Sequence, residues 1–361
     1  MAEGFDIAVV GAGMAGASLA ALLAPHARVV LLEAEAQPGY HATGRSAAFW
    51  TESYGGPLVQ PLTSASGAFL AEHGFLIPRG ALTLGRAGQE ETVEDFARRF
   101  SALGVRVELL GREGIAGHVP GLRPEWTLGA YEPDCSDIDV ARLHQHYLAA
   151  ARRAGAALWC SARLSEARRE RDGWHLTLED GRGLRAQVLV DAAGAWADTV
   201  ATRSGVAPLG IAPLRRTVVQ LLTAPAVPAT LPLVLDVAER FYFKPESGRL
   251  WLSPHDETPT PPCDAAPEEL DIALAIDRFE QVVDWRVERV EHRWAGLRSF
   301  APDRLPVYGF DPAEPGFFWF AGQGGFGIQT APAAAALAAG LLLGAPGGAI
   351  DPAPYAPARF R

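Results

Sequence analysis

Lysine is nearly absent from this chain of 361 residues, because Lys244 is the only one among 32 lysines and arginines. Any chemistry that depends on a lysine amine would therefore have to use Lys244. Cysteine is also scarce: Cys135, Cys160 and Cys263 lie far apart, and none of them forms a CxxC pair. This spacing argues against a disulfide framework and a zinc site, and it predicts reduced thiols in a cytoplasmic protein.

Excess positive charge and membrane segments are missing as well. The formal net charge is −10 at pH 7, which argues against a nucleic-acid partner because such partners require a basic face. Too few residues precede Phe5 for a signal peptide. The alanine-rich run at 331–343 is short for a membrane span and contains Pro332. We therefore predict a packed helix there and no integral membrane segment.

The N-terminal stretch FDIAVVGAGMAGASLAALLAPHARVVLLEAE has the pattern of a strand, a loop, a helix and a second strand. Residues 7–10 form an apolar run typical of a buried parallel strand. Residues 15–23 follow as a predicted helix, and residues 29–32 form the second apolar run. This order is the structural context that a glycine-rich nucleotide-binding loop requires.

The glycines of that loop have the spacing GxGxxG. Gly11 permits a tight turn, Gly13 lets the backbone approach a pyrophosphate, and Gly16 allows the helix to pack closely on the strand. Glu33 ends the second strand and is expected to accept the ribose hydroxyls of an adenosine. The pattern predicts a bound dinucleotide and leaves NAD and FAD both open.

A resemblance decides between the two cofactors. The segment GYHATGRSAAFWTESYGG, residues 39–56, resembles the signature that follows the second strand in the D-amino-acid oxidase superfamily of flavoproteins. Within that superfamily, the chain most resembles bacterial D-arginine dehydrogenase and its D-amino-acid dehydrogenase relatives. Five more segments match in order along the chain, at 188–198, 213–220, 241–245, 292–309 and 317–335. The resemblance implies FAD. It implies non-covalent binding, because the flavin-linked cysteine of the sarcosine oxidase branch has no match after Cys263.

The family also implies a fold of mixed α/β class with two domains. A Rossmann-type FAD-binding domain is expected from residues 1–50, 140–205 and 300–361. A discontinuous substrate domain with an antiparallel sheet is expected from residues 51–139 and 206–299. The local patterns predict a helix at 90–103, a hairpin from 174–178 through the turn at 179–183, and an irregular surface loop at 256–269.

Three segments are expected to contact the flavin. One matches the family segment near the isoalloxazine and the pyrophosphate, and it consists of Thr43, Gly44, Arg45, Ser46 and Ala47. Gly194 and Trp196 belong to a loop that follows a predicted buried strand. The third is Gly324, Gly325, Phe326, Gly327, Ile328 and Gln329. This last segment precedes a helix, whose free N–H groups and positive end suit the negative charge of reduced flavin.

The resemblance also implies a substrate site. Arg298 matches the arginine that binds the substrate carboxylate, which a guanidinium can do with two hydrogen bonds. Arg216 matches a second such arginine. Its neighbour Arg215 is hard to exclude, although adjacent strand residues face opposite ways and only one of the two should reach the site. Tyr242 and Tyr54 match tyrosines that line the pocket.

Departures from the D-arginine dehydrogenase pattern bear on the substrate side chain. Phe49 replaces a histidine, and Gly80 lies where that branch carries a glutamate that pairs with a guanidinium. A buried cation without a counter-charge is costly, so neutral or apolar D-amino acids are expected rather than arginine. Lys244 is two residues beyond Tyr242, and we predict a charge at the rim of the pocket.

The resemblance implies oxidative deamination of D-amino acids to 2-oxo acids and ammonia, by hydride transfer from Cα to flavin N5. Whether oxygen or a quinone accepts the electrons stays open. Three alternatives remain. One is a secondary-amine oxidase of the sarcosine or glycine type. Another is a 2-hydroxy-acid dehydrogenase, which would need a base for the hydroxyl proton, a role that His41 matches poorly. The third is a flavoprotein without redox turnover.

Overall fold

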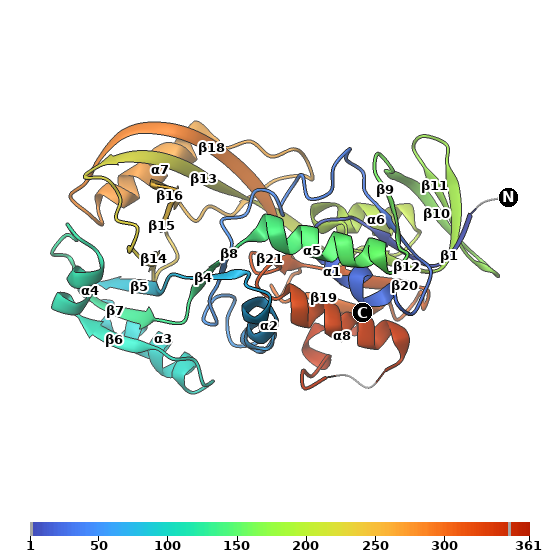
Figure 1. The fold of residues 1–361 in the computed structure, drawn as a ribbon, viewed down its shortest axis with the longest axis horizontal. Helices are drawn as coiled ribbons and strands as arrows, with labels where there is room; N and C mark the ends of the chain where they lie inside the picture. The colour runs from blue at the N-terminus through green and yellow to red at the C-terminus, as the bar shows by residue number, and fades with distance from the viewer. Residues whose placement is uncertain (1–2, 346–347) are drawn as a thin grey trace.

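The computed structural model describes residues 3–345 and 348–361. Two large sheets occupy the two ends of the molecule along its long axis (Figure 1). The first has eight strands in the order β10-β11-β12-β1-β2-β9, with β20 paired to β12 and β19 paired to β20. These strands are β1 (Glu3–Val10), β2 (Val29–Leu32), β9 (Ala157–Trp159), β10 (Leu164–Glu170), β11 (Gly173–Leu178), β12 (Gly183–Asp191), β19 (Val307–Phe310) and β20 (Phe317–Ala321).

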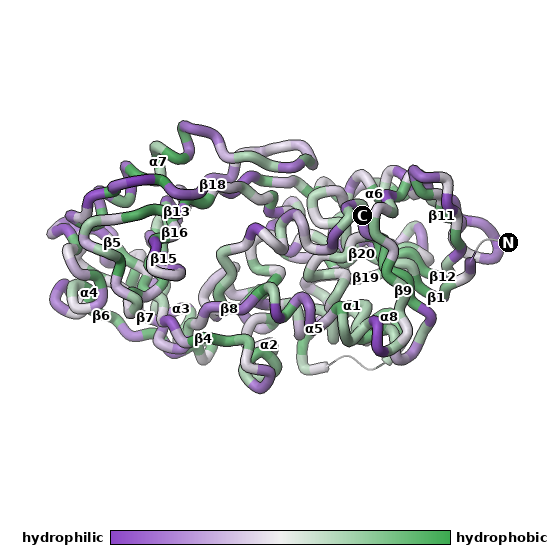
Figure 2. The backbone as a smooth tube through the Cα atoms, turned by 45° about the horizontal axis from the view of Figure 1, so that its top comes forward, coloured by the Kyte–Doolittle hydropathy of each residue, from purple (hydrophilic) through white to green (hydrophobic). Residues whose placement is uncertain are grey.

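The centre of the first sheet is parallel and buried on both faces. Strand β1 pairs in parallel with β2 and with β12, so that Val9 lies between Leu31 and Val190. Such strands are continuous apolar runs because neither face meets water, and Figure 2 shows the hydrophobic stretches around β9 and β12. One face packs on α1 (Met14–Leu23), α2 (Gln60–Glu72), α5 (Val140–Arg153) and α8 (Ala331–Leu343). The other face packs on α6 (Ala197–Arg203).

The second sheet is mostly antiparallel and has ten strands in the order β21-β18-β13-β16-β15-β14-β5-β7-β6, with β17 paired to β13. Its longest members, β13 (Ala212–Ala224) and β18 (Arg286–Phe300), pair along most of their length. The others are β5 (Ala81–Arg86), β6 (Glu108–Gly111), β7 (Trp126–Glu132), β14 (Leu233–Asp236), β15 (Tyr242–Glu246), β16 (Arg249–Ser253), β17 (Thr258–Pro259) and β21 (Gln323–Gly324).

Helices cover one face of this second sheet. Apolar residues of α4 (Arg112–His118) and α7 (Glu269–Glu280) join those of the strands in one core cluster. Helix α3 (Glu90–Ser101) packs in a smaller cluster against Ala130 of β7. The other face is not packed against these helices and is called the uncovered face below. It carries the side chains that alternate along the strands with those of this core.

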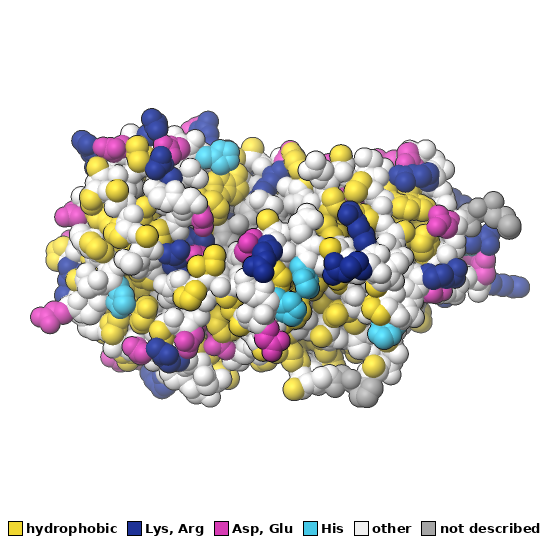
Figure 3. All heavy atoms as spheres, in the orientation of Figure 1, with side chains coloured by type: hydrophobic (Ala, Val, Ile, Leu, Met, Phe, Trp, Pro, Cys, Tyr) yellow, Lys and Arg dark blue, Asp and Glu magenta, His cyan; other side chains and the backbone are white. Residues whose placement is uncertain are grey.

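A small three-stranded sheet and three short 3-10 helices complete the fold. The sheet joins β3 (Phe49–Trp50), β8 (Ser136–Ile138) and β4 (Leu76–Pro78) in that order. The 3-10 helices are η1 (Gly194–Trp196), η2 (Ala353–Tyr355) and η3 (Pro357–Phe360). Basic and acidic side chains are interspersed over the face drawn in Figure 3.

Several local predictions are confirmed. Helices form at α1, α3 and α8, and the hairpin forms between β11 and β12. The Pro-rich stretch is irregular apart from the two residues of β17, until α7 begins at Glu269. The domain boundaries stay a prediction. Among the described residues, no helix has both the length and the apolarity that crossing a membrane requires.

Candidate active site

A large cavity begins at the carboxyl ends of the parallel strands and extends to the uncovered face of the second sheet. Ligands of open α/β sheets bind at this edge. Most of the predicted site residues line the cavity, namely Gly11, Gly13, Glu33, Thr43, Arg45, Ser46, Ala47, Gly194, Trp196, Arg216, Tyr242, Arg298, Gly324, Gly325, Gly327 and Ile328. Five do not line it, namely Gly16, Gly44, Tyr54, Phe326 and Gln329.

The glycine-rich loop at the start of the cavity has no room for side chains. Gly11 has a φ of +101°, and a Cβ there would lie 2.5 Å from the carbonyl oxygen of Ala192. A Cβ on Gly16 would lie 1.9 Å from the carbonyl oxygen of Gly11, so this glycine serves helix packing rather than the cavity wall. The hydroxyl of Thr43 accepts a hydrogen bond from the N–H of Met14, at 2.9 Å. This bond fixes the loop against the segment at Thr43, and Gly13, Met14 and Ala15 line the cavity, so the positive end of α1 faces the space where a dinucleotide would place its phosphates.

Glu33 lies at the end of β2 and is nearly buried, with 9% of its surface exposed. Its two carboxylate oxygens accept hydrogen bonds from the N–H groups of Ala12, at 3.1 Å, and Glu35, at 3.0 Å. These bonds fix the carboxylate beside the glycine loop, where its remaining lone pairs can accept ribose hydroxyls. The residues at this end of the cavity therefore fit the adenosine half of a dinucleotide.

Arg45 lines the cavity, but its guanidinium is engaged by the protein. It donates to the carbonyl oxygens of Ala265, at 3.0 Å, and Ala295, at 3.1 Å, and it pairs with Asp264. The Asp264 carboxylate also accepts a hydrogen bond from the hydroxyl of Tyr40, at 3.0 Å. Arg45 therefore holds the Pro-rich stretch over the cavity, whereas the sequence pattern predicts a surface loop.

In the C-terminal glycine segment, residues 324–329, some residues line the cavity and others are buried in the protein interior. A Cβ on Gly325 would lie 2.5 Å from the hydroxyl oxygen of Tyr54 and 2.7 Å from Nη1 of Arg298, so a side chain there would displace these two groups. Phe326 packs in a buried cluster with Val59. Gln329 is 2% exposed, and its amide nitrogen donates to the carbonyl oxygen of Tyr54 at 3.2 Å. The segment therefore shapes the cavity partly through Tyr54.

Arg298 and Arg216 project from the same face of the second sheet. Leu214 of β13 is paired with Arg298 of β18, and Arg216 is two residues further along β13. Residues two apart on a strand share a face, so the two arginines are diagonal neighbours. Nη1 of Arg298 donates to the hydroxyl oxygen of Tyr54 at 2.5 Å. Among the described residues, no carboxylate lies within 4.0 Å of the Arg298 guanidinium.

Arg216 is only 4% exposed and keeps one donor free. Its Nε donates to the carbonyl oxygen of Asp256 at 2.7 Å, and its Nη2 donates to Glu257 at 3.2 Å. Its Nη1 is buried without a hydrogen-bond partner. Burial lowers the pKa of Arg216, and the nearby charge of Arg298 lowers it further. An anion between the two guanidiniums would relieve both effects.

Arg215 points the other way, toward α7. It is paired with Asp271 at 2.9 Å and with Glu268 at the start of the helix. The alternation of the strand thus separates the two adjacent arginines, with Arg216 at the cavity and Arg215 in a structural ion-pair network.

Aromatic rings gather near the end of the cavity that holds Arg298. Tyr242 lines the wall, and Tyr54 reaches the site through its contact with Arg298. The ring of Phe49 packs edge-on against both, with centroids 5.6 Å from Tyr54 and 6.0 Å from Tyr242. A Cβ on Gly80, whose φ is +74°, would lie 2.6 Å from the hydroxyl oxygen of Tyr131. A glutamate therefore has no room at position 80.

The prediction for Lys244 is wrong. Its side chain is 2% exposed, and its Nζ lies 2.7 Å from Asp137 and 3.2 Å from Glu246. The amine is a member of a buried ion pair and not a charge at the rim. The sequence could not show this, because Asp137 belongs to β8, which is far away along the chain.

Sequence reasoning missed some of the cavity wall. Cys263 and Ala265 of the Pro-rich stretch line the cavity, as do Val218, Ser299 and Gln323. The sequence carries no signal for the first two, because a proline-rich loop looks the same whether it covers a site or faces water. Val218 could have been found, since it is two residues beyond Arg216 and shares its strand face.

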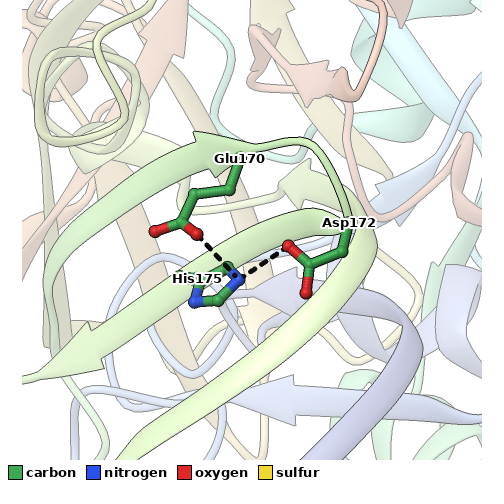
Figure 4. A group of neighbouring side chains, drawn as sticks. All are labelled: Glu170, Asp172 and His175. Atoms are coloured by element: carbon green, nitrogen blue, oxygen red, sulfur yellow. Dashed lines mark hydrogen bonds and ion pairs between the residues drawn. The ribbon is translucent and has the colours of Figure 1, made fainter.

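One cluster of possible metal ligands lies outside the cavity. Glu170, Asp172 and His175 approach one another on the hairpin between β10 and β11 (Figure 4). His175 Nε2 lies 3.0 Å from Asp172 and 3.5 Å from Glu170, and Arg185 lies 3.2 Å from the other oxygen of Asp172. The three residues and Arg185 therefore form an ion-pair cluster at the surface.

Comparisons with known proteins place the chain in a family. The family model described as DAO, FAD dependent oxidoreductase, matches residues 6–341. A glycine oxidase of Geobacillus kaustophilus (strain HTA426) is 28% identical over 366 residues, which cover 95% of this chain and 94% of that protein.

Two solved structures share the fold. The glycine oxidase structure from Geobacillus kaustophilus superposes with a TM-score of 0.86 at 24% identity, covering 98% of each chain. The L-proline dehydrogenase structure from P. horikoshii superposes with a TM-score of 0.87 at 22% identity, covering 100% of this chain and 98% of the other. The narrower resemblance to D-arginine dehydrogenase stays a prediction. The chain belongs to the DAO family of FAD-dependent oxidoreductases and is an enzyme with FAD as its cofactor.

Proposed function

We propose that this enzyme oxidatively deaminates D-amino acids with neutral or apolar side chains, giving 2-oxo acids and ammonia. The observation that carries the proposal is Arg298, a half-buried guanidinium at the cavity wall with a tyrosine hydroxyl on one N–H and no protein carboxylate within 4.0 Å among the described residues. A guanidinium in this state is suited to a substrate carboxylate.

In this proposal, one end of the cavity binds the cofactor and the other end binds the substrate. The glycine loop and Glu33 are at one end and would hold the adenosine half of FAD, and Arg298, Arg216 and Tyr242 are at the other. When bound, FAD supplies the acceptor for the hydride that leaves the substrate Cα. The arginines orient the substrate through its carboxylate, which contributes to catalysis by positioning. The imino acid product then hydrolyses in water.

The imidazole of His255, beside Tyr242, is a poor base, and the proposed reaction needs no base. Burial lowers the pKa of His255 to about 2, and the charges of Arg216 and Arg298 lower it as well. This imidazole is therefore neutral and a very weak base at neutral pH. A substrate that arrives with a neutral amine can expel the hydride with its own lone pair. Oxidation of a 2-hydroxy acid would require a base for the hydroxyl proton, so amines are favoured.

A second candidate is a glycine or secondary-amine oxidase. The similarity to a glycine oxidase over 95% of the chain favours it, and so does the packing of Phe49 against Tyr54 and Tyr242, which gathers rings near the substrate end. Both candidates use the same carboxylate site. They differ in the side chain and in the substituent on nitrogen.

The test is to mix the purified holoenzyme with candidate substrates without oxygen and to measure flavin reduction as the loss of flavin absorbance. The panel contains D-alanine, D-valine, their L-forms, D-arginine, glycine, sarcosine and D-lactate. Reduction by the neutral D-amino acids alone supports the first proposal. Reduction by glycine or sarcosine alone supports the second. Reduction by D-lactate alone, or by no compound, contradicts both.

A further inference from the structure

Glu132 is a buried carboxylate that holds one turn of the chain. It is the last residue of β7, and only 4% of it is exposed. Its oxygens accept hydrogen bonds from the Thr51 hydroxyl at 2.7 Å, the Glu52 N–H at 2.7 Å and the Ser53 hydroxyl at 2.6 Å. Three consecutive residues thus donate to a single side chain from another element.

The burial of the Glu132 carboxylate costs free energy, and a strand does not require a carboxylate at this position. Burial raises the pKa of Glu132, while the hydrogen bonds from Ser53, Thr51 and Glu52 lower it. A buried carboxylate is unfavourable unless its lone pairs are satisfied, and here donors from the turn at 51–53 satisfy them. The carboxylate and the turn therefore stabilise each other in one defined position.

The turn ends at Tyr54, whose hydroxyl accepts the hydrogen bond from Arg298. Gln329 also fixes this turn, because its amide nitrogen donates to the Tyr54 carbonyl oxygen at 3.2 Å and its amide oxygen lies 3.4 Å from the Thr51 nitrogen. Gln329 in turn donates to Thr63 of α2 at 2.9 Å. Tyr54 is thus placed by both a carboxylate and an amide.

We infer that Glu132 is a positioning residue for the substrate carboxylate, and that it acts through the turn at 51–53 and Tyr54 on Arg298. It does not line the cavity, so it has no direct contact with the substrate. The inference rests on the proposed function, because it assumes that Arg298 receives a carboxylate. Its consequence is that the loss of Glu132 weakens substrate binding while leaving the chemical step almost unchanged.

The test is a double-mutant cycle of Glu132→Gln and Tyr54→Phe in the holoenzyme, with whichever of glycine, sarcosine or D-alanine reduces the flavin. Glu132→Gln should raise KM about tenfold and change kcat less than about twofold. In the Tyr54→Phe background it should raise KM no further. Additive effects on KM, or a fall in kcat without a change in KM, overturn the inference.

A matched control separates positioning from the general loss of a buried carboxylate. Asp236, at the end of β14 in the same sheet, is 3% exposed and accepts hydrogen bonds from the Ala238 N–H and from Arg240. Asp236→Asn should leave KM unchanged. Ser53→Ala removes one donor without altering Glu132 and should give a smaller rise in KM. Equal rises for Glu132→Gln and Asp236→Asn overturn the inference.

A holoenzyme crystal structure of Glu132→Gln tests the same inference independently of the substrate. The Tyr54 hydroxyl should lie beyond hydrogen-bonding distance of Arg298. An unchanged contact overturns the role of Glu132 even if the amino-acid panel succeeds. A broken contact supports that role even if the panel fails, in which case only the proposed function is lost.

Discussion

At the scale of single residues, the proposed function depends most on Arg298. Its side chain is half-buried at the cavity wall and donates to the neutral hydroxyl of Tyr54. We predict that Arg298→Met lowers the rate of anaerobic flavin reduction at limiting substrate about 100-fold, since charge-assisted hydrogen bonds contribute about 1.5–3 kcal/mol. Stopped-flow absorbance measures it. Arg289→Met, at an exposed position of the same strand, should have no effect, and an active Arg298→Met enzyme would contradict the assignment.

The adjacent arginines of β13 provide a second prediction. Arg216→Met should raise KM about tenfold or more, because Arg216 lines the cavity and its Nη1 has no protein partner. Arg215→Met should leave KM unchanged and lower the melting temperature, because Arg215 joins the sheet to α7 through Asp271 and Glu268. Substrate titration and thermal unfolding of both variants check this. The reverse pattern would show that the faces of the strand are wrongly assigned.

At the scale of elements, the stretch from 256 to 268 contributes to the cavity wall and is fastened to the rest of the fold by β17 and by side-chain bonds along its length. Arg216 and Thr217 bind its start at Asp256, Arg215 binds its end at Glu268, and Arg45 binds its middle at Asp264. Cys263 and Ala265 thereby face the cavity. The two adjacent arginines thus anchor both ends of a segment that covers part of the cavity.

We predict that Asp264→Asn speeds the dissociation of FAD about twofold to fivefold. The change weakens the bonds from Arg45 and Tyr40 that hold the stretch down, and an exposed pair of this kind contributes about 1 kcal/mol or less. The recovery of flavin fluorescence after dilution measures the rate. Glu269→Gln removes a comparable exposed pair with Arg293 outside the cavity and should have no effect. Equal rates in wild type and Asp264→Asn would show that the stretch does not retain FAD.

The elements that sequence could predict are those with local determinants. The β1–α1–β2 unit is specified by Gly11, Gly16 and the apolar runs beside them, which lie close together in the sequence. The two strands and the helix could therefore be predicted. Gln329 and Tyr54 are 275 residues apart, and no local pattern reports that an amide of the glycine segment supports a turn. The cover over the cavity was missed for the same reason, since Arg45 and Asp264 meet only in the fold.

At the scale of the whole molecule, each sheet supplies half of the site. The parallel sheet supplies the glycine loop and Glu33, whereas the uncovered face of the second sheet supplies Arg216, Tyr242 and Arg298. This division follows from the sheet types, because helix N-termini gather at the carboxyl edge of parallel strands, while an antiparallel face presents alternate side chains in rows. The proposed active site therefore depends on the position of each sheet relative to the other.

The buried imidazole of His255 makes the stability of the molecule sensitive to acid. Its pKa is lowered to about 2, first by burial and then by the charges of Arg216 and Arg298. The folded state therefore keeps His255 neutral, while the unfolded chain takes up a proton below about pH 6.5. Stability from this group is complete above pH 6.5 and is lost as the pH falls toward 2. The loss is about 1.4 kcal/mol per pH unit well below 6.5.

We compare the wild type with His255→Asn, which removes the imidazole. Asparagine is chosen because His255 has a φ of +57°, a left-handed conformation that asparagine tolerates better than most residues. Asp256 has its pKa raised by burial and opposes the trend in both proteins, so the comparison between the two isolates the imidazole. Between pH 6.5 and pH 5, the free energy of unfolding of the wild type should fall by about 1.5 kcal/mol relative to the variant. Urea unfolding at the two pH values measures it. Parallel pH dependence in the two proteins would mean that the imidazole is charged in the folded enzyme, and the substrate end would then hold a third cation beside Arg216 and Arg298.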